Sequence, residues 1–157
     1  MGLLLRAPTM PGETFSYRFP VPITIPAAEP ARPQILIADP DEMTFGYLCA
    51  ALRGAGYLAD AVSSGYALLD RMGRGGIHLV AVSLTLSDMS GAVAAARVRE
   101  ICPARPIILL AHRGAGVRHG PLRHAVAACL FKPVDPPQFV GMCQRILGFS
   151  LRGGPRP

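Results

Sequence analysis

The chain has 157 residues, of which half are apolar and 17% charged, and its formal net charge is +6. This composition predicts a folded globular protein and argues against a disordered chain. Its basic residues are scattered, which argues against a nucleic-acid-binding tail, and Lys132 is the only lysine. No apolar stretch approaches the ~20 residues of a membrane span, so we expect a cytoplasmic protein without a membrane segment.

The first 33 residues differ in composition from the rest of the chain. Residues 1–33 hold seven of the 16 prolines and only five charged side chains, a composition that disfavours helix and removes donors from a strand ladder. We predict an N-terminal extension, which is either a disordered leader or an extended arm that lays an apolar stripe on its own domain or on a partner. The stripe has an apolar side chain at every second position: Phe15, Tyr17, Phe19, Val21, Ile23 and Ile25.

From residue 34 onward the sequence alternates between strand and helix patterns. Apolar runs predict strands at 35–38, 58–62, 78–82, 107–110 and 129–131, and helical periodicity predicts helices at 45–52, 65–72, 91–101 and 137–147, with a short helix starting near Pro121. Residues 34–148 then form one domain, and 149–157 a flexible tail. This alternation predicts an α/β fold with a doubly wound, five-stranded parallel sheet of strand order 2-1-3-4-5 and helices on both faces.

In a sheet of this kind, ligand chemistry lies beyond the carboxyl ends of the strands. Asp39, Pro40 and Asp41 follow the first predicted strand, and Ser83 follows the third. Asp41 also suits the N-cap of the helix that follows, with Glu42 in the first turn of that helix. Any reaction of this domain is therefore decided at these positions.

Five motifs of the domain resemble, in order and spacing, the receiver domain of two-component response regulators. They are Ile35-Leu36-Ile37-Ala38-Asp39, Ser64-Gly65-Tyr66-Ala67-Leu68, Leu86-Ser87-Asp88-Met89-Ser90-Gly91, Pro106-Ile107-Ile108-Leu109-Leu110 and Phe131-Lys132-Pro133. The resemblance implies the CheY-like, flavodoxin-type fold and a role in bacterial two-component signalling. It also implies a reaction in which a carboxylate after the third strand attacks phosphohistidine, assisted by Mg²⁺ on acidic side chains and by a lysine after the fifth strand.

Carried over position by position, the resemblance predicts a degenerate phosphorylation pocket. The phosphoacceptor position falls on Ser83, the second acid after the first strand on Pro40, and the switch hydroxyl on Ala111. The charged residues that remain in the pocket are Asp39, Asp41 and Lys132. We therefore predict a pseudo-receiver that works without phosphorylation and has no catalytic residue, cofactor or metal, in which Lys132 forms an ion pair with Asp39.

Two chemical alternatives stay open at the level of sequence. Phosphotransfer through Ser83 would need a base, and His112 is the nearest histidine to the predicted pocket. A metal site would need His119 and His124 on one face with Cys129. The four cysteines, Cys49, Cys102, Cys129 and Cys143, show no metal-ligand spacing, so we expect buried free thiols.

Without phosphotransfer, such a domain acts through its surface. Residues 97–124 carry six arginines and one acid, Glu100. The candidate surface consists of Arg113, Arg118, Arg123 and Phe131. Our leading hypothesis is a module that binds a signalling protein or a second copy of itself. DNA binding is disfavoured, because no helix-turn-helix segment follows the receiver-like region. The alternatives are a sensor of an anionic ligand, such as a cyclic dinucleotide, and a merely solvated loop.

Overall fold

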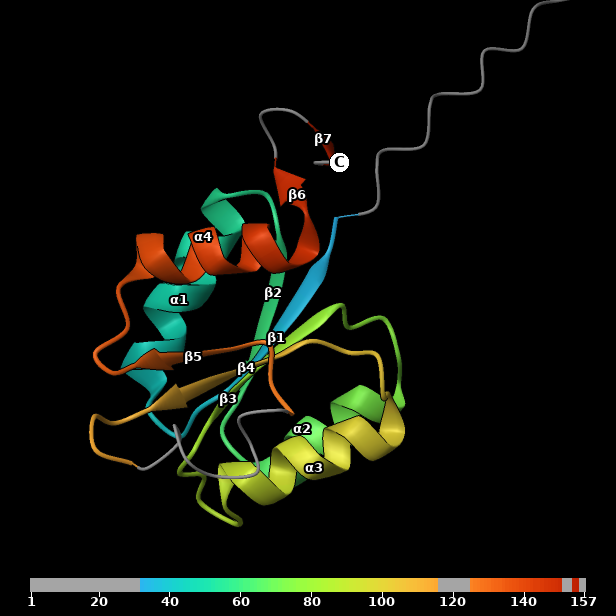
Figure 1. Ribbon diagram of the computed structural model, residues 1–157, viewed down its shortest axis with the longest axis vertical. Coiled ribbons are helices and arrows are strands. Elements are labelled where there is room, and N and C mark those ends of the chain that lie inside the picture. Colours follow the sequence, from blue (N-terminus) through green and yellow to red (C-terminus); the bar gives the residue numbers. More distant parts are fainter. Residues whose placement is uncertain (1–31, 116–124, 151–153, 156–157) are drawn as a thin grey trace, which may run out of the picture. The chain divides into compact units, whose positions relative to one another are not determined.

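The computed structural model describes residues 32–115, 125–150 and 154–155 (Figure 1). The elements in chain order are β1 (Gln34–Ala38), α1 (Glu42–Gly54), β2 (Leu58–Val62), α2 (Gly65–Gly73), β3 (Leu79–Ser83), α3 (Gly91–Ile101), β4 (Ile107–Ala111), β5 (Ala128–Phe131), α4 (Pro136–Leu147), β6 (Phe149–Ser150) and β7 (Gly154–Pro155). The predicted apolar stripe at 15–25 and the predicted helix near Pro121 lie outside the described residues.

The predicted sheet is confirmed. Five parallel strands are hydrogen-bonded in the order β2-β1-β3-β4-β5, which is the doubly wound arrangement of the flavodoxin and CheY-like folds. At its far end the chain forms a second, two-residue antiparallel ladder between β6 and β7, with Phe149 opposite Pro155. This ladder lies inside the segment for which the sequence predicts a flexible tail.

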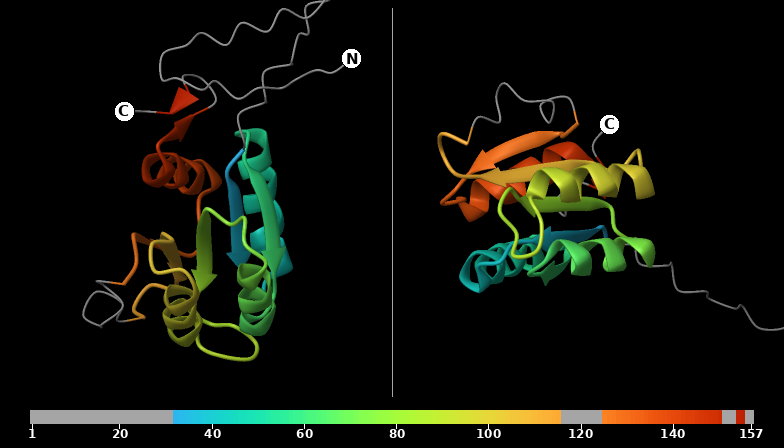
Figure 2. Two further views of the ribbon diagram at one scale, coloured as in Figure 1. Left: turned by 90° about the vertical axis from the view of Figure 1, so that its right-hand side faces the viewer. Right: turned by 90° about the horizontal axis from the view of Figure 1, so that it is seen from below.

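Helices cover both faces of the five-stranded sheet, because alternate strand residues point to opposite sides. On one face, Ile35 and Ile37 of β1 pack with Leu48 and Leu52 of α1 and with Phe139 of α4. The other face has an equivalent core: Leu36, Val80, Val82 and Leu109 pack with Leu68 of α2 and with Ala94 and Val98 of α3. Figure 1 shows α1 and α4 above the sheet and α2 and α3 below it, and the right-hand view of Figure 2 has α2 and α3 in front of the strands.

The predicted elements are recovered to within a few residues, with one informative shift at the third strand. The sequence predicts this strand at 78–82, whereas β3 is Leu79–Ser83, and all five of its residues are buried. His78 lies just before β3 and contacts Gln34 twice: its amide donates to the Gln34 carbonyl at 2.8 Å, and its Nδ1 accepts the Gln34 amide at 2.9 Å. The shift makes Ser83 the last residue of the strand.

Local chemistry fixes the start of each described helix. Asp41, Ser64, Ser90 and Asp135 are N-caps whose side chains accept an amide of the first turn, an arrangement that stabilises a helix by about 1 kcal/mol. The predicted role of Asp41 as a cap, with Glu42 in the first turn, is thus confirmed. Within the described part of the chain, no helix combines the length and apolarity that crossing a bilayer demands.

Candidate functional site

The sequence-predicted pocket is assembled at the carboxyl ends of four adjacent strands, where the arrowheads of β1, β3, β4 and β5 point the same way in Figure 1. Asp39 follows β1, Ser83 ends β3, Ala111 ends β4 and Lys132 follows β5. Asp39, Ser83 and Ala111 are buried, with exposed fractions of 0%, 1% and 0%. Because the strands are parallel and adjacent, these residues lie close together at one edge of the sheet.

Lys132 contacts two of these residues. Its Nζ lies 2.7 Å from Oδ2 of Asp39 and donates a hydrogen bond of 3.1 Å to Oγ of Ser83. The backbone of Lys132 is anchored as well, because its amide donates to the Ala111 carbonyl at 2.7 Å, and the peptide bond that follows, to Pro133, is cis. The ion pair that the sequence predicts between Lys132 and Asp39 is present.

The carboxylate of Asp39 is held from two sides. Its Oδ1 accepts the Asp41 amide at 2.9 Å. Among the described residues its Oδ2 has no hydrogen-bond donor, since the Lys132 ammonium approaches it as an ion pair without hydrogen-bond alignment. A buried carboxylate is costly unless an opposite charge compensates it, so Lys132 is the group that makes burial of Asp39 tolerable.

Asp41 and Pro40 are both exposed, unlike Asp39. Both carboxylate oxygens of Asp41 serve the first turn of α1, where they accept from the Met43 amide at 3.2 Å and from the Thr44 hydroxyl. The Thr44 hydroxyl, with smaller contributions from the Met43 and Thr44 amides and from the Lys132 charge, holds the pKa of Asp41 below its ordinary value of 3.8. Asp41 is thus a helix cap, and Pro40, which is exposed, carries no side-chain ligand atom.

The donor set does not fit the Mg²⁺ site that a receiver fold implies. Mg²⁺ needs hard oxygen ligands, usually including carboxylates, and here the second acid is Pro40 while Ser83 offers a neutral hydroxyl. Asp39, whose carboxylate is buried, is already neutralised by Lys132. No group of three or more His, Cys, Asp or Glu side chains with metal-binding proximity occurs in the part of the chain that the structure describes.

The geometry also bears on Ser83 as a nucleophile. A general base must lie within hydrogen-bond reach of the proton it removes. In the described structure Oγ of Ser83 accepts from Lys132, and a charged ammonium that donates to Oγ cannot take its proton. His112 is exposed, and no hydrogen bond joins it to Ser83 among the described residues.

Sequence reasoning missed two supports of the loop between β3 and α3. Asp88 accepts the amides of Gly65 and Tyr66 at 2.7 and 2.9 Å, so it ties this loop to the start of α2, and these two bonds hold its pKa below the ordinary 3.8. Gly91 donates to the Leu84 carbonyl at 2.7 Å, and a Cβ on Gly91 would overlap the Ser83 carbonyl. The residue types of this loop do not by themselves indicate either contact, because each contact depends on how the loop is placed in the fold.

The expectation of four buried thiols is correct for only two of them. Cys49 and Cys143 are buried, while Cys102 and Cys129 are half-buried. Burial raises the pKa of Cys143 to about 12 and also raises that of Cys49. Cys102 is the C-cap of α3 and Cys129 lies in the edge strand β5, and both pack partly buried against the core.

Only part of the predicted surface can be placed. Arg113 is exposed on the loop that follows β4, and Phe131 is half-buried at the end of the edge strand β5. Arg118 and Arg123, together with His119 and His124 of the alternative metal site, lie outside the described residues. The cationic surface and its anionic ligand therefore stay predictions.

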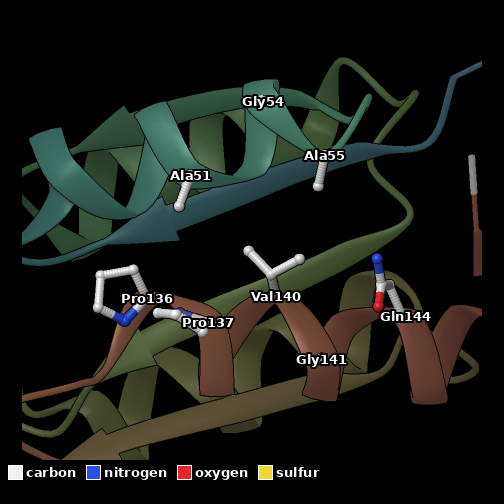
Figure 3. A pocket seen from close by; sticks show the side chains of 8 residues that line it. All are labelled: Ala51, Gly54, Ala55, Pro136, Pro137, Val140, Gly141 and Gln144. Atoms are coloured by element: carbon white, nitrogen blue, oxygen red, sulfur yellow. The ribbon is translucent and has the colours of Figure 1, made fainter.

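A groove of about 490 Å³ runs between α1 and α4 (Figure 3). Its lining is small or apolar apart from one amide: Ala51, Gly54, Ala55, Pro136, Pro137, Val140, Gly141 and Gln144. These residues include no acid, base or nucleophile. The groove therefore has no side chain that could act in catalysis, and the pocket at the strand ends remains the candidate site.

Comparison with solved structures identifies the architecture. The chain superposes on the chemotaxis protein CheY4 of Vibrio cholerae with a TM-score of 0.69 and 19% identity, over 74% of this chain and 100% of that one. A response-regulator receiver domain of Methanospirillum hungatei gives 0.69 and 19%, over 74% and 94%, and one of Methylobacillus flagellatus gives 0.66 and 24%, over 74% and 99%. The chain has the receiver fold.

Two comparisons of the sequence give no match. No family model matches the chain, and no curated protein matches it. At identities of 19–24% the structural likeness establishes the fold, and what the receiver fold does in this chain has to be argued from its own residues.

Proposed function

We propose that this chain is a phosphorylation-independent receiver module that regulates a protein partner in two-component-type signalling, in the cytoplasm. The observation that carries the proposal is the position of Lys132, whose ammonium contacts the Asp39 carboxylate at 2.7 Å and the Ser83 hydroxyl at 3.1 Å. The charge that would meet a phosphoryl group is thereby neutralised within the protein. A module without that input acts as a constant binding surface.

The neighbouring positions support the same proposal. Acyl-phosphate formation needs a carboxylate nucleophile, and Ser83 supplies a hydroxyl whose only described side-chain contact is a donor. The methyl group of Ala111 cannot hydrogen-bond to phosphoryl oxygens, so a phosphoryl group here would find no switch residue. Pro40 removes a metal ligand. Three separate functions of a phosphorylation pocket are therefore missing at Ser83, Ala111 and Pro40.

Reaction of the full-length chain with acetyl phosphate and Mg²⁺, followed by intact mass measurement, tests the chemical half of the proposal. We expect no phosphoryl adduct on the natural chain or on the matched control Ser83→Ala. The double variant Pro40→Asp/Ser83→Asp restores both carboxylates and should gain an adduct, which shows that the conditions suffice. An adduct on the natural chain that disappears in Ser83→Ala would overturn the proposal.

The regulatory half concerns binding. Crosslinking of the full chain in the host cell, with and without a membrane-permeant phosphoryl donor, should recover the same protein partners or the same homodimer in both conditions. A partner that is recovered only after phosphoryl-donor treatment, and is lost in Ser83→Ala, would contradict phosphorylation independence. Recovery of no partner and no dimer would contradict the interaction role itself.

A further inference from the structure

A second cavity lies at the opposite ends of the strands from the Asp39–Lys132 pair. It has a volume of about 280 Å³ and is formed between the connection from α2 to β3 and the connection from α3 to β4. The residues that line it are Met72, Gly73, Gly75, Gly76, Ile77, Ile101, Cys102 and Arg105. It is therefore separate from the degenerate pocket, and the proposed function makes no use of it.

Arg105 is the one ionisable cation in this lining, and its hydrogen-bonding capacity is mostly unused. A guanidinium carries five N–H donors. Its Nη2 donates to Sγ of Cys102 at 3.2 Å, and sulfur is a weak acceptor. Its Nε is buried and has no acceptor among the described residues. No ion pair joins Arg105 to a carboxylate within the same described part of the chain, so a half-buried cation lacks its natural counter-charge.

Two glycines also line the cavity, and the Gly75 backbone is hydrogen-bonded, its amide to the Met72 carbonyl at 3.1 Å and its carbonyl to Nη1 of Arg71 at 2.9 Å. Gly75 and Gly76 have φ angles of 76° and 81°, which favour glycine, and no atom lies within 4 Å of where a Cβ would stand on either. The amide of Gly76 has no acceptor among the residues that the structure describes. A backbone donor and a guanidinium therefore line the same space, which is a pairing that recognises oxyanions.

The remaining surroundings limit what could enter. Met72 and Ile77, with exposed fractions of 5% and 2%, contribute buried apolar side chains to the lining. No acid lines it, and the acid on the last turns of α2, Asp70, is already paired with Arg74 at 2.8 Å. The volume is below the ~300–1,000 Å³ of pockets for drug-sized ligands.

We propose that this cavity binds a small organic anion, whose carboxylate or phosphate group pairs with Arg105 and whose compact apolar body rests on Met72 and Ile77. Such a ligand supplies the counter-charge and the acceptor that Arg105 lacks. Because the cavity bridges the loops that enter β3 and β4, occupation would tie the helix pair α2–α3 to the sheet at the end away from Ser83. The ligand is thus an input independent of phosphate at the strand ends.

The test is a titration of the ¹⁵N-labelled full chain followed by amide correlation spectra, with isobutyrate in one arm and inorganic phosphate in the other. Sodium chloride at equal ionic strength is the reference. We expect saturable shifts at 72–77 and 101–105 in at least one arm. Response to isobutyrate alone assigns a carboxylate ligand, response to phosphate alone a phosphate ligand, and response to both an oxyanion site without further discrimination.

Variants separate a binding role of Arg105 from a structural one. Arg105→Lys keeps the charge but loses the planar fork, and should weaken binding about tenfold, while Arg105→Gln should abolish it. The matched control Arg74→Gln removes a neighbouring exposed arginine and should bind as the natural chain does. Without ligand, Arg105→Gln should be as stable as the natural chain, because an unpaired cation contributes no ion pair.

Two results would overturn the proposal. One is the absence of saturable shifts at 72–77 and 101–105 with both probes. The other is equal affinity of the natural chain, Arg105→Lys and Arg105→Gln, which would place the anion elsewhere. The amide shifts of the natural chain decide the first point even where a variant folds poorly.

Discussion

Removal of the Lys132 ammonium is the perturbation that the structure predicts most sharply. The variant Lys132→Met keeps an unbranched side chain of similar length but leaves the fully buried Asp39 carboxylate without its partner. At the observed 2.7 Å, two unit charges at an effective dielectric of about 20 attract each other by about 6 kcal/mol. Desolvation of both charges offsets part of this attraction, and loss of one partner of a buried pair costs about 3–5 kcal/mol in practice.

The lower end of that range applies here, because the Lys132 side chain is 13% exposed and retains some contact with water. We therefore expect Lys132→Met to lower the free energy of unfolding by about 3 kcal/mol, a large part of the ~5–15 kcal/mol of an ordinary domain. Urea unfolding followed by circular dichroism measures it, and the slope against urea should not change.

A double-mutant cycle attributes the loss to the pair. Asp39→Asn/Lys132→Met removes both charges, so it should be less destabilised than the sum of the two single variants by at least about 1.5 kcal/mol. The exposed pair Asp70–Arg74, whose side chains are 67% and 70% exposed, is the matched control, and Arg74→Gln should cost under about 0.5 kcal/mol. A loss below about 1 kcal/mol in Lys132→Met, or strict additivity in the cycle, would refute the reasoning.

Three further predictions follow from contacts around the site. Gly91→Ala should lower the free energy of unfolding in urea by about 1–3 kcal/mol, because its Cβ would overlap the Ser83 carbonyl and lie 2.6 Å from the Leu84 Cα. The control Gly46→Ala has open space around it and should leave this free energy unchanged or raise it. Equal changes in the two variants would contradict the prediction. Because the native pKa of Asp88 is lowered, Asp88 contributes stability above its ordinary pKa of 3.8 that is lost as the pH falls through the native pKa. Asp88→Asn should therefore flatten the plot of melting temperature against pH below pH 3.8. An unchanged plot would contradict a stabilising role of the bonds from Gly65 and Tyr66 to Asp88. In the native chain a thiol reagent should label Cys102 while leaving Cys143 unlabelled until urea is added; early labelling of Cys143 would contradict its burial.

The sheet could be predicted from the sequence because its strands are short, apolar and separated by helical periodicity. Apolar runs such as Leu79–Ser83 are buried on both faces, and right-handed crossovers then leave few strand orders. The bounds of β3 differ from the predicted strand by one residue at each end. His78 meets Gln34 through a main-chain bond and through its imidazole, which accepts the Gln34 amide, and an apolar pattern does not indicate such a side-chain contact.

The candidate site was predictable to the extent that it depends on strand ends. Asp39, Ser83 and Lys132 each follow or end an apolar strand, so a parallel sheet brings them together, and the ion pair follows from their charges. The contacts of Asp88 and Arg105 depend on which loops of distant sequence face one another. Asp88 reaches Gly65 over 23 residues of sequence, and Arg105 lines the same cavity as Gly75 and Gly76, which belong to another connection. Only the folded chain brings these residues together.

The most direct test of the central proposal, that the pocket at the strand ends no longer takes a phosphoryl group, is an amide correlation spectrum of the ¹⁵N-labelled full chain with Mg²⁺ and beryllofluoride, a stable phosphoryl mimic. We predict that the amides of Asp39, Ser83 and Lys132 do not shift when Mg²⁺ and beryllofluoride are added together, while the amides at the same positions of Pro40→Asp/Ser83→Asp do. Saturable shifts in the natural chain that require both Mg²⁺ and beryllofluoride would contradict it.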